Sequence, residues 1–358
     1  MYSTDKRWKQ LGELLVNYSC EVKPGERVMI AMGELETFPL VQATYEAAIK
    51  AGAFPQVQFL SETLRHSFLK YGDDQQLAWV PEIEASGMDW ADVYFGLRGA
   101  YNLYEHADIS ADRLAVNQAA MGKVSTLRWQ KTRWCLVRVP NANLAQQAET
   151  DLETITDMFF DACLLDWRAE GAKLRSWTEK LSQASQVRLV GKDTDLSFSV
   201  KGRKWMAAVG KANMPDGEIG TAPLTETVDG QIYFEFPGVL GGRLVHDMCL
   251  RWDDGKLVKA SSSTNQDFLQ AIVNTDPGAS LIGEFAMGTN AGVTRFCKDI
   301  LLDEKIGGTV HIALGRAYPD CGGTNESAIH WDIIKDIRKD GAVYVDGQTV
   351  LQNGVFYL

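Results

Sequence analysis

Short apolar runs and longer segments of helical periodicity alternate along the first half of the chain. The apolar runs lie at 26–32, 54–60, 90–97 and 134–140, separated by glycine and proline and by segments such as 39–53 and 109–122, whose apolar residues recur at helical spacing. Such alternation predicts βαβ units, in which a parallel sheet is covered by helices on its faces. We therefore expect an N-terminal parallel-sheet α/β domain over residues 1–185.

A long helical pattern joins the two halves of the chain. Residues 144–186 contain no proline and no turn signal before Glu170–Gly171. We expect two successive helices here.

The pattern changes after residue 186 to short strands at close spacing. Strand-like runs lie at 187–191, 195–202, 231–237, 244–252, 256–262, 342–347, 348–351 and 354–358. Asp-Gly pairs at 229–230, 254–255 and 346–347 are typical of hairpin turns. We therefore expect a C-terminal β-rich α+β domain over residues 186–358, with a mixed or antiparallel sheet.

Composition and charge narrow the class of protein. The chain has 358 residues, 45% of them apolar, and ten tryptophans, which is enough to fill two cores. A net charge of -11 argues against nucleic acid and anionic membrane surfaces as partners, because both would repel the protein. The loops at 29–36 and 96–102 lack the glycine spacing with which backbone amides surround phosphates, so we do not expect nucleotide binding.

The expected location is the cytoplasm. No uncharged apolar run approaches the roughly 18 to 20 residues that span a bilayer. Residues 1–19 have the spacing of a helix and lack the apolar core of a secretory signal. Six scattered cysteines without a C-x-x-C pair fit a reducing compartment and do not support a structural zinc ribbon.

Side chains that bind metals are concentrated near the C-terminus. His330 and Asp332 are two residues apart in the strand-like run IHWDII, so both point to one face. An isolated pair of this kind is usually a solvated polar face. Here Glu284, His311 and Tyr318 precede it, and a carboxylate-rich set with two histidines suits divalent ions, including a pair bridged by a carboxylate.

From about Arg7 to its end the chain resembles metallopeptidase family M29, the aminopeptidase T and aminopeptidase S group. The resemblance rests on the order and spacing of VKPGERVMI, ISADRLA, VPNANLAQQAE, NMPDGEIGTAP, DGQIYFEFPG, GEFAMGTN, LLDEKIGGTVHIALGRAYP and NESAIHWDII. It implies a metal centre formed by Glu218, Glu284, His311, Tyr318, His330 and Asp332. It also implies two divalent ions (zinc, cobalt or manganese), a peptide substrate with a free N-terminus, and a homodimer.

Three departures from the family pattern are visible. Many members have T-E-E where this chain has Asp216-Gly217-Glu218, which leaves Glu226 as an alternative to Glu218. The spacer between Glu304 and His311 is two residues longer, and the loop from Tyr318 to His330 is shorter.

The chemistry expected of such a centre is hydrolysis of the N-terminal peptide bond. Two divalent ions activate a shared water and polarise the carbonyl, while the free α-amino group completes the coordination of one ion. Tyr318 is expected to bind a metal or to donate to the oxyanion. Glu284 or a second carboxylate would move the proton, and Glu304 is a candidate for the general base or for an anchor of His311.

Two alternatives from other classes stay open. In the first, His311 or His246 joins His330 and Asp332 in a single-iron facial triad, as in ring-cleaving dioxygenases of the same fold. In the second, the chain is a non-catalytic binding protein. Two bound ions per chain, one iron, or none would separate these readings.

Overall fold

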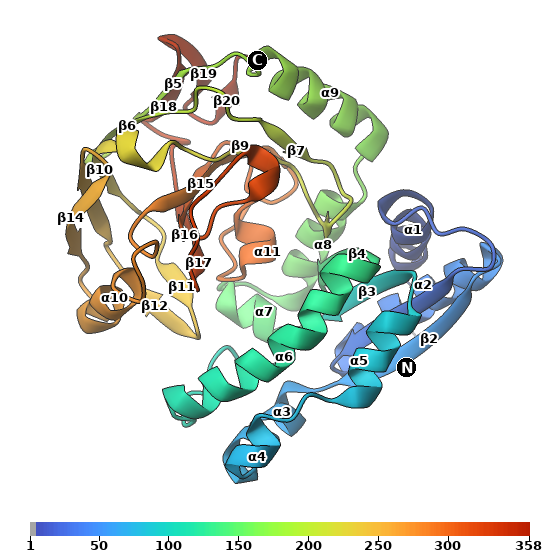
Figure 1. The fold of residues 1–358 in the computed structure, drawn as a ribbon. Coiled ribbons are helices and arrows are strands. Elements are labelled where there is room, and N and C mark those ends of the chain that lie inside the picture. Colours follow the sequence, from blue (N-terminus) through green and yellow to red (C-terminus); the bar gives the residue numbers. More distant parts are fainter. Residues whose placement is uncertain (1–4) are drawn as a thin grey trace. The chain divides into compact units, whose positions relative to one another are not determined.

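The computed structural model describes residues 5–358, which form two compact units (Figure 1). The first unit extends to Leu164 and also contains Gly210–Pro215; the second consists of Leu165–Val209 and Asp216–Leu358. We expected one boundary after residue 185. In the structure, residues 165–185 group with the second unit, and the chain returns briefly to the first.

The first unit is built on a parallel sheet of order β2-β1-β3-β4-β8. Its strands are β1 (Arg27–Gly33), β2 (Phe54–Leu60), β3 (Val93–Arg98), β4 (Arg133–Arg138) and β8 (Asn213–Met214). The helices are α1 (Lys6–Leu14), α2 (Phe38–Lys50), α3 (Glu62–Tyr71), α4 (Asp74–Leu77), α5 (Glu82–Trp90), α6 (Ala111–Lys131), α7 (Ala142–Gln147) and α8 (Leu152–Cys163). The predicted α/β alternation is confirmed.

The helical stretch that follows contains three helices, so the prediction of two was wrong. The third is α9 (Trp167–Lys180), and Gly171, taken as a turn signal, lies inside it. The starts are set by side chains that accept hydrogen bonds from free backbone N–H groups: Asn141 before α7, Asp151 before α8 and Asp166 before α9. Asp151 and Asp166 thus separate successive helices although no proline or glycine lies between those helices.

The second unit contains two larger antiparallel sheets, of order β14-β13-β10-β6-β5-β18-β19-β20 and β17-β16-β15-β9-β7, and the small pair β11-β12. The strands are β5 (Gln186–Gly191), β6 (Thr194–Ser199), β7 (Met206–Ala208), β9 (Glu218–Thr221), β10 (Asp229–Tyr233), β11 (Gly238–Leu240), β12 (Arg243–Val245), β13 (Cys249–Asp253), β14 (Lys256–Ser261), β15 (Ile282–Gly288), β16 (Val310–Gly315), β17 (His330–Lys335), β18 (Ala342–Val345), β19 (Gln348–Gln352) and β20 (Val355–Phe356). Helices α10 (Gln266–Val273) and α11 (Ile300–Asp303) complete the unit.

One apolar core takes side chains from both large sheets. Phe198 of β6 and Phe285 of β15 meet edge to face with their ring centroids 5.2 Å apart. Because one face of the β17-to-β7 sheet is buried in this core, its other face is available for polar side chains.

Two of the three predicted hairpin turns are present. Asp254–Gly255 joins β13 to β14, and Asp346–Gly347 joins β18 to β19. Asp229–Gly230 instead begins β10, where Gly230 has φ +110° and a Cβ would lie 2.1 Å from the carbonyl oxygen of Asp195. Glycine is therefore required by close strand approach, which explains why a turn was wrongly predicted.

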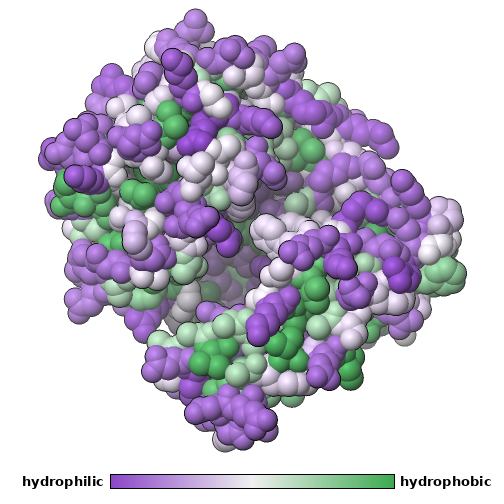
Figure 2. All heavy atoms as spheres, in the orientation of Figure 1, coloured by the Kyte–Doolittle hydropathy of each residue, from purple (hydrophilic) through white to green (hydrophobic). Residues whose placement is uncertain are grey.

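The outer face drawn in Figure 2 consists mainly of hydrophilic residues, with smaller hydrophobic patches. Within residues 5–358, no helix combines the length and the apolar character needed to cross a membrane. None of the six cysteines, which all lie within residues 5–358, forms a disulfide.

Candidate metal centre

Four neighbouring strands bring the predicted ligands to one face of the β17-to-β7 sheet. Asp332 of β17 is opposite Ala313 of β16, and Ala313 is opposite Glu284 of β15. His311 occupies the same face of β16 two residues before Ala313. The small side chain of Ala313 leaves space between the two carboxylates.

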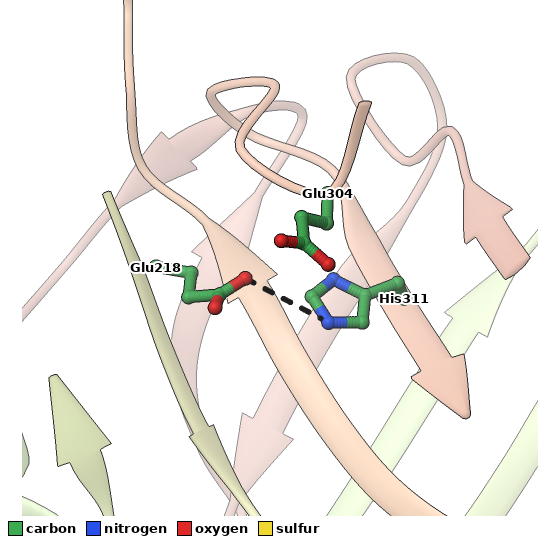
Figure 3. A group of neighbouring side chains, drawn as sticks. All are labelled: Glu218, Glu304 and His311. Atoms are coloured by element: carbon green, nitrogen blue, oxygen red, sulfur yellow. Dashed lines mark ion pairs between the residues drawn. The ribbon is translucent and has the colours of Figure 1, made fainter. Parts of the chain in front are cut away.

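The remaining predicted residues reach the same place from strand ends and loops. Glu218 begins β9, His330 begins β17, and Tyr318 follows β16 with its ring centroid 4.9 Å from that of His330. Glu304 follows α11, and Figure 3 shows the carboxyl groups of Glu218 and Glu304 both pointing toward the imidazole of His311. The structure thus brings all seven predicted site residues together.

Glu284 lies between the two imidazoles. Its Oε2 is 3.3 Å from Nε2 of His330, and its Oε1 is 3.8 Å from Nε2 of His311. His330 Nε2 is also 3.3 Å from Oδ1 of Asp332, while His311 Nε2 is 3.7 Å from Oε2 of Glu218. Glu284 therefore directs one carboxylate oxygen toward each histidine.

Two groups of ligand atoms overlap at His311. In each group of three residues, one ligand atom per residue lies within 4.8 Å of the others. The groups are Glu218, Glu304 and His311, and Glu284, His311 and Asp332. A third acidic group on the surface (Asp229, Asp253 and Asp254) is fully exposed and has no histidine.

Lys305 is the main component of the site that the sequence did not indicate. Its side chain is 0% exposed, and Nζ is 2.6 Å from Glu218 Oε1, 2.8 Å from Glu304 Oε1 and 3.2 Å from Asp216 Oδ1. Burial alone would lower the pKa of Lys305, but the three carboxylates raise it well above its ordinary value. The ammonium is thus a permanent positive charge beside the ligands.

Two carboxylic acids in the cluster have opposite pKa shifts. Burial raises the pKa of Glu304 to about 8, although Lys305 opposes the shift. Burial would also raise the pKa of Glu284, but hydrogen bonds and positive charges from His311 and His330 outweigh it and lower the value to about 2. Glu284 therefore stays ionised, whereas Glu304 exchanges a proton near neutral pH.

The imidazoles and the phenol are also perturbed. Burial disfavours the charged imidazoles, but the surrounding carboxylates outweigh it and raise the pKa of His311 to about 9 and of His330 to about 11. Burial, reinforced by nearby carboxylates, raises the pKa of Tyr318 above its usual range. Tyr318 is consequently a protonated hydrogen-bond donor at neutral pH.

The donor set fits a divalent metal ion. Oε2 of Glu218 and Nδ1 of His311 are buried and have no hydrogen-bond partner among residues 5–358. Imidazole nitrogens with carboxylate and phenol oxygens suit ions such as zinc, cobalt and manganese. Two alternatives considered from the sequence are not part of the cluster: Glu226 lies exposed in the turn Thr225–Thr227, and His246 is exposed between β12 and β13.

Comparison with known proteins gives a consistent family match. A family model described as thermophilic metalloprotease (M29) matches residues 4–356. Aminopeptidase 2 of Geobacillus stearothermophilus is 24% identical, with 96% of this chain and 95% of the relative covered. Aminopeptidase T of Thermus aquaticus is also 24% identical, with 96% and 95% covered.

Solved structures share the fold. Wild-type AmpT from Thermus thermophilus superposes with a TM-score of 0.89 at 22% identity, covering 99% of this chain and 100% of that chain. A 2,5-dihydroxypyridine dioxygenase from Pseudomonas putida KT2440 gives a TM-score of 0.61 at 15% identity, with 98% and 96% covered. The same architecture therefore occurs in proteins named for different reactions.

Proposed function

Because the chain belongs to the M29 family of thermophilic metalloproteases and is a metallo-aminopeptidase, we propose that it releases N-terminal amino acids from peptides at a centre of two divalent ions. The observation that carries the two-ion proposal is the overlap of two ligand groups at His311, with Glu284 between the imidazoles. A single-ion centre would not need both groups.

The balance of charge in the cluster also supports two divalent ions. Five carboxyl groups face the cluster or its lysine; when all five are ionised, as ligands and a proton acceptor must be, Lys305 neutralises one of them and four negative charges remain. These carboxylates are Asp216, Glu218, Glu284, Glu304 and Asp332. Two divalent ions with neutral histidines would balance that charge, whereas one would leave buried carboxylates uncompensated.

We assign the ligands by their position. Glu218 and His311 would hold one ion, His330, Asp332 and Tyr318 the other, and Glu284 would bridge them. Bound ions of this kind supply Lewis acidity and an activated water. The identity of the ions (zinc, cobalt or manganese) belongs to the proposal.

Proton transfer is assigned to Glu304. With its pKa raised to about 8, this carboxyl can accept a proton from the attacking water and return it to the leaving amine. Glu284, whose pKa is lowered to about 2, is a poor base and is better suited to binding cations. Tyr318 keeps its proton and can donate a hydrogen bond to the developing oxyanion.

The first experiment counts metal in the purified protein. We expect two equivalents per chain. Asp332→Ala should lose at least one of them and nearly all hydrolysis of aminoacyl-p-nitroanilides, with an unchanged far-UV circular dichroism spectrum. Asp253→Ala removes a carboxylate from the exposed acidic group. It should change neither the metal content nor the rate of hydrolysis. Full activity in Asp332→Ala would contradict the assignment, and one iron per chain without hydrolysis would favour the oxygenase reading.

A second experiment tests the requirement for a free amine. A peptide with a free N-terminus should lose that residue, and its N-acetylated counterpart should remain intact. Losing the amine-to-metal contact and leaving polar groups unpaired should cost about 2 to 4 kcal/mol in the specificity for the blocked peptide. Equal cleavage of both peptides would indicate an endopeptidase.

A third experiment separates the two glutamates. Glu304→Gln should lower kcat by at least roughly a hundredfold, even at saturating metal, if Glu304 moves the proton. Glu284→Gln should mainly weaken metal binding. If excess metal restores the rate of Glu304→Gln but not that of Glu284→Gln, the two roles must be exchanged.

We also propose a cytoplasmic location and a homodimer. The free cysteines support a reducing compartment. The dimer rests on the family resemblance, and sedimentation of the purified protein would test it.

A further inference from the structure

The first unit has a pocket at the carboxyl edge of its parallel sheet. In the order β2-β1-β3, the chain passes from β1 to β2 on one side of β1 and then crosses to β3 on the other side. The loops that follow β1 and β3 therefore lead away from each other. The pocket is lined by Gly33 and Glu34 after β1 and by Arg98, Gly99 and Ala100 at the end of β3. Ligands of open parallel sheets commonly bind at such a switch point.

Small residues form the floor of this pocket. Ala31 of β1 pairs with Gly96 of β3, and both face the same side of the sheet as Tyr94. Toward the amino end, Met29 and Tyr94 fill that face; Ala31 and Gly96 are smaller, and Leu136 packs beside Gly96, where a Cβ would lie 2.6 Å from Leu136 Cδ2. The resulting cavity of about 430 Å³ can contain a small ligand.

Arg128 of α6 places a guanidinium in the wall of this pocket. The guanidinium carbon is 4.8 Å from the ring centroid of Trp134 and 5.9 Å from that of Tyr94, so aromatic rings hold the group in place. Its Nε is buried without a hydrogen-bond partner in residues 5–358, and its NH2 group has a long contact of 3.5 Å to Ser125. This cation is fixed but not neutralised.

Arg98 adds a second guanidinium. It ends β3 on the face that carries Tyr94 and Gly96, and within the described residues neither Arg98 nor Arg128 has a carboxylate within ion-pair distance. Arg98 and Arg128 line the same pocket, which places the two cations near each other. An anion between the two guanidiniums would interact favourably with both.

The neighbouring charged groups are already engaged elsewhere. Arg65 lies 3.5 Å from Glu62, and Arg138 donates to backbone carbonyls, including Val139 O at 2.7 Å. Glu34 accepts a hydrogen bond from the N–H of Glu62 at the start of α3. Glu34 and Glu62 also line the pocket, and Glu62 pairs with His106 at 2.8 Å; among residues 5–358 neither carboxylate forms an ion pair with Arg98 or Arg128.

We propose that the first unit binds a small oxyanion, a carboxylate or a phosphate group, between the guanidinium groups of Arg98 and Arg128. Guanidinium pairs bind such planar or tetrahedral groups through charge-assisted hydrogen bonds. Side chains provide the positive charge here, which is consistent with the absence of a glycine-rich phosphate loop in 29–36 and 96–102. The proposal does not depend on the metal centre.

The test is isothermal titration of the metal-loaded protein with inorganic phosphate and, separately, with L-leucine. We expect saturable binding of at least one probe with a Kd of roughly 1 mM or below. Arg98→Ala and Arg128→Met should each weaken it at least tenfold, the effect of losing one charge-assisted hydrogen bond. Arg98 is exposed, so its replacement should not disturb folding.

Two control variants locate the site. Arg27→Gln removes an arginine from the opposite edge of the same sheet, where it pairs with Asp92, and should leave binding unchanged. Asp332→Ala lacks a complete metal centre, so the binding that Arg98→Ala weakens should persist in it; binding lost in Asp332→Ala but kept in Arg98→Ala would belong to the metal centre and overturn the proposal. Tighter binding of phosphate than of leucine identifies a phosphate ligand, and the reverse identifies a carboxylate. Absence of binding, or equal affinity in Arg98→Ala and the parent, would overturn the proposal.

Discussion

Replacing Lys305 by methionine would test the charge balance of the metal centre. Methionine has a similar length but no charge, so the variant keeps the volume and removes the ammonium. The side chain of Lys305 is 0% exposed and contacts three carboxylates, those of Asp216, Glu218 and Glu304. These groups have side-chain exposures of 3%, 16% and 13%, so water cannot replace the lost cation.

The expected cost is large in the metal-free protein. Removing one partner of a buried ion pair typically destabilises by about 3 to 5 kcal/mol, because a charge is left buried without compensation. Bound divalent ions add positive charge beside the same carboxylates. The variant's loss in free energy of unfolding, relative to the parent, should therefore be smaller when metal is present. By linkage, the variant should then bind metal more tightly than the parent does.

Lys335→Met is the matched control. Lys335 is also 0% exposed, but among residues 5–358 it forms an ion pair with one carboxylate, that of Glu235, at 2.6 Å with a side-chain exposure of 26%, outside the metal cluster. Urea unfolding of all three proteins at pH 8, with and without metal, gives the comparison. Lys335→Met should be destabilised by the same amount in both conditions. The reasoning would be refuted if metal-free Lys305→Met were as stable as the parent. It would also be refuted if metal did not reduce the difference in free energy of unfolding between Lys305→Met and the parent.

Four further predictions concern the ligands and the fold. Metal binding at pH 7 should release protons, detected as a buffer-dependent heat, because the pKa values of His311 and His330 are raised to about 9 and 11. The metal-free protein should accordingly lose stability as pH rises through those values, since the stabilisation is complete only below the ordinary value of 6.5. Phe285→Ala should cost about 3 to 5 kcal/mol in denaturant unfolding. Gly230→Ala should cost more than about 1 kcal/mol, because its φ is +110° and Asp195 approaches closely.

The periodicity of the sequence predicts features that depend on residues close together in the chain. The shared face of His330 and Asp332 follows from a spacing of two in a strand, and their 3.3 Å separation agrees with it. The run 244–252 was expected to be one strand, but Asp247, at φ +50°, separates β12 from β13. Local hydropathy does not reveal such a break.

The hydropathy pattern does not predict which strands distant in the sequence pair with one another. Lys305 appears in LLDEK as an ordinary charged residue, and lysine is rarely buried. Its burial depends on Asp216 and Glu218, almost ninety residues earlier in the chain, which approach because β9 pairs with β15 and β15 with β16. Only the assembled sheet shows that this cation belongs to the site.

The same contact explains a departure from the family pattern. Gly217 has φ +111°, and a Cβ there would lie 3.1 Å from Asn290 Cβ, so the glutamate found at the middle position of T-E-E would be strained in this chain. Asp216 instead supplies a carboxylate to Lys305, at 3.2 Å, and Glu218 keeps its Oε2 directed toward His311. Asp216 thus adds a negative charge beside the buried lysine. Replacing Lys305 would therefore remove the cation beside the buried Asp216, whereas replacing Asp216 would leave Lys305 paired with Glu218 and Glu304.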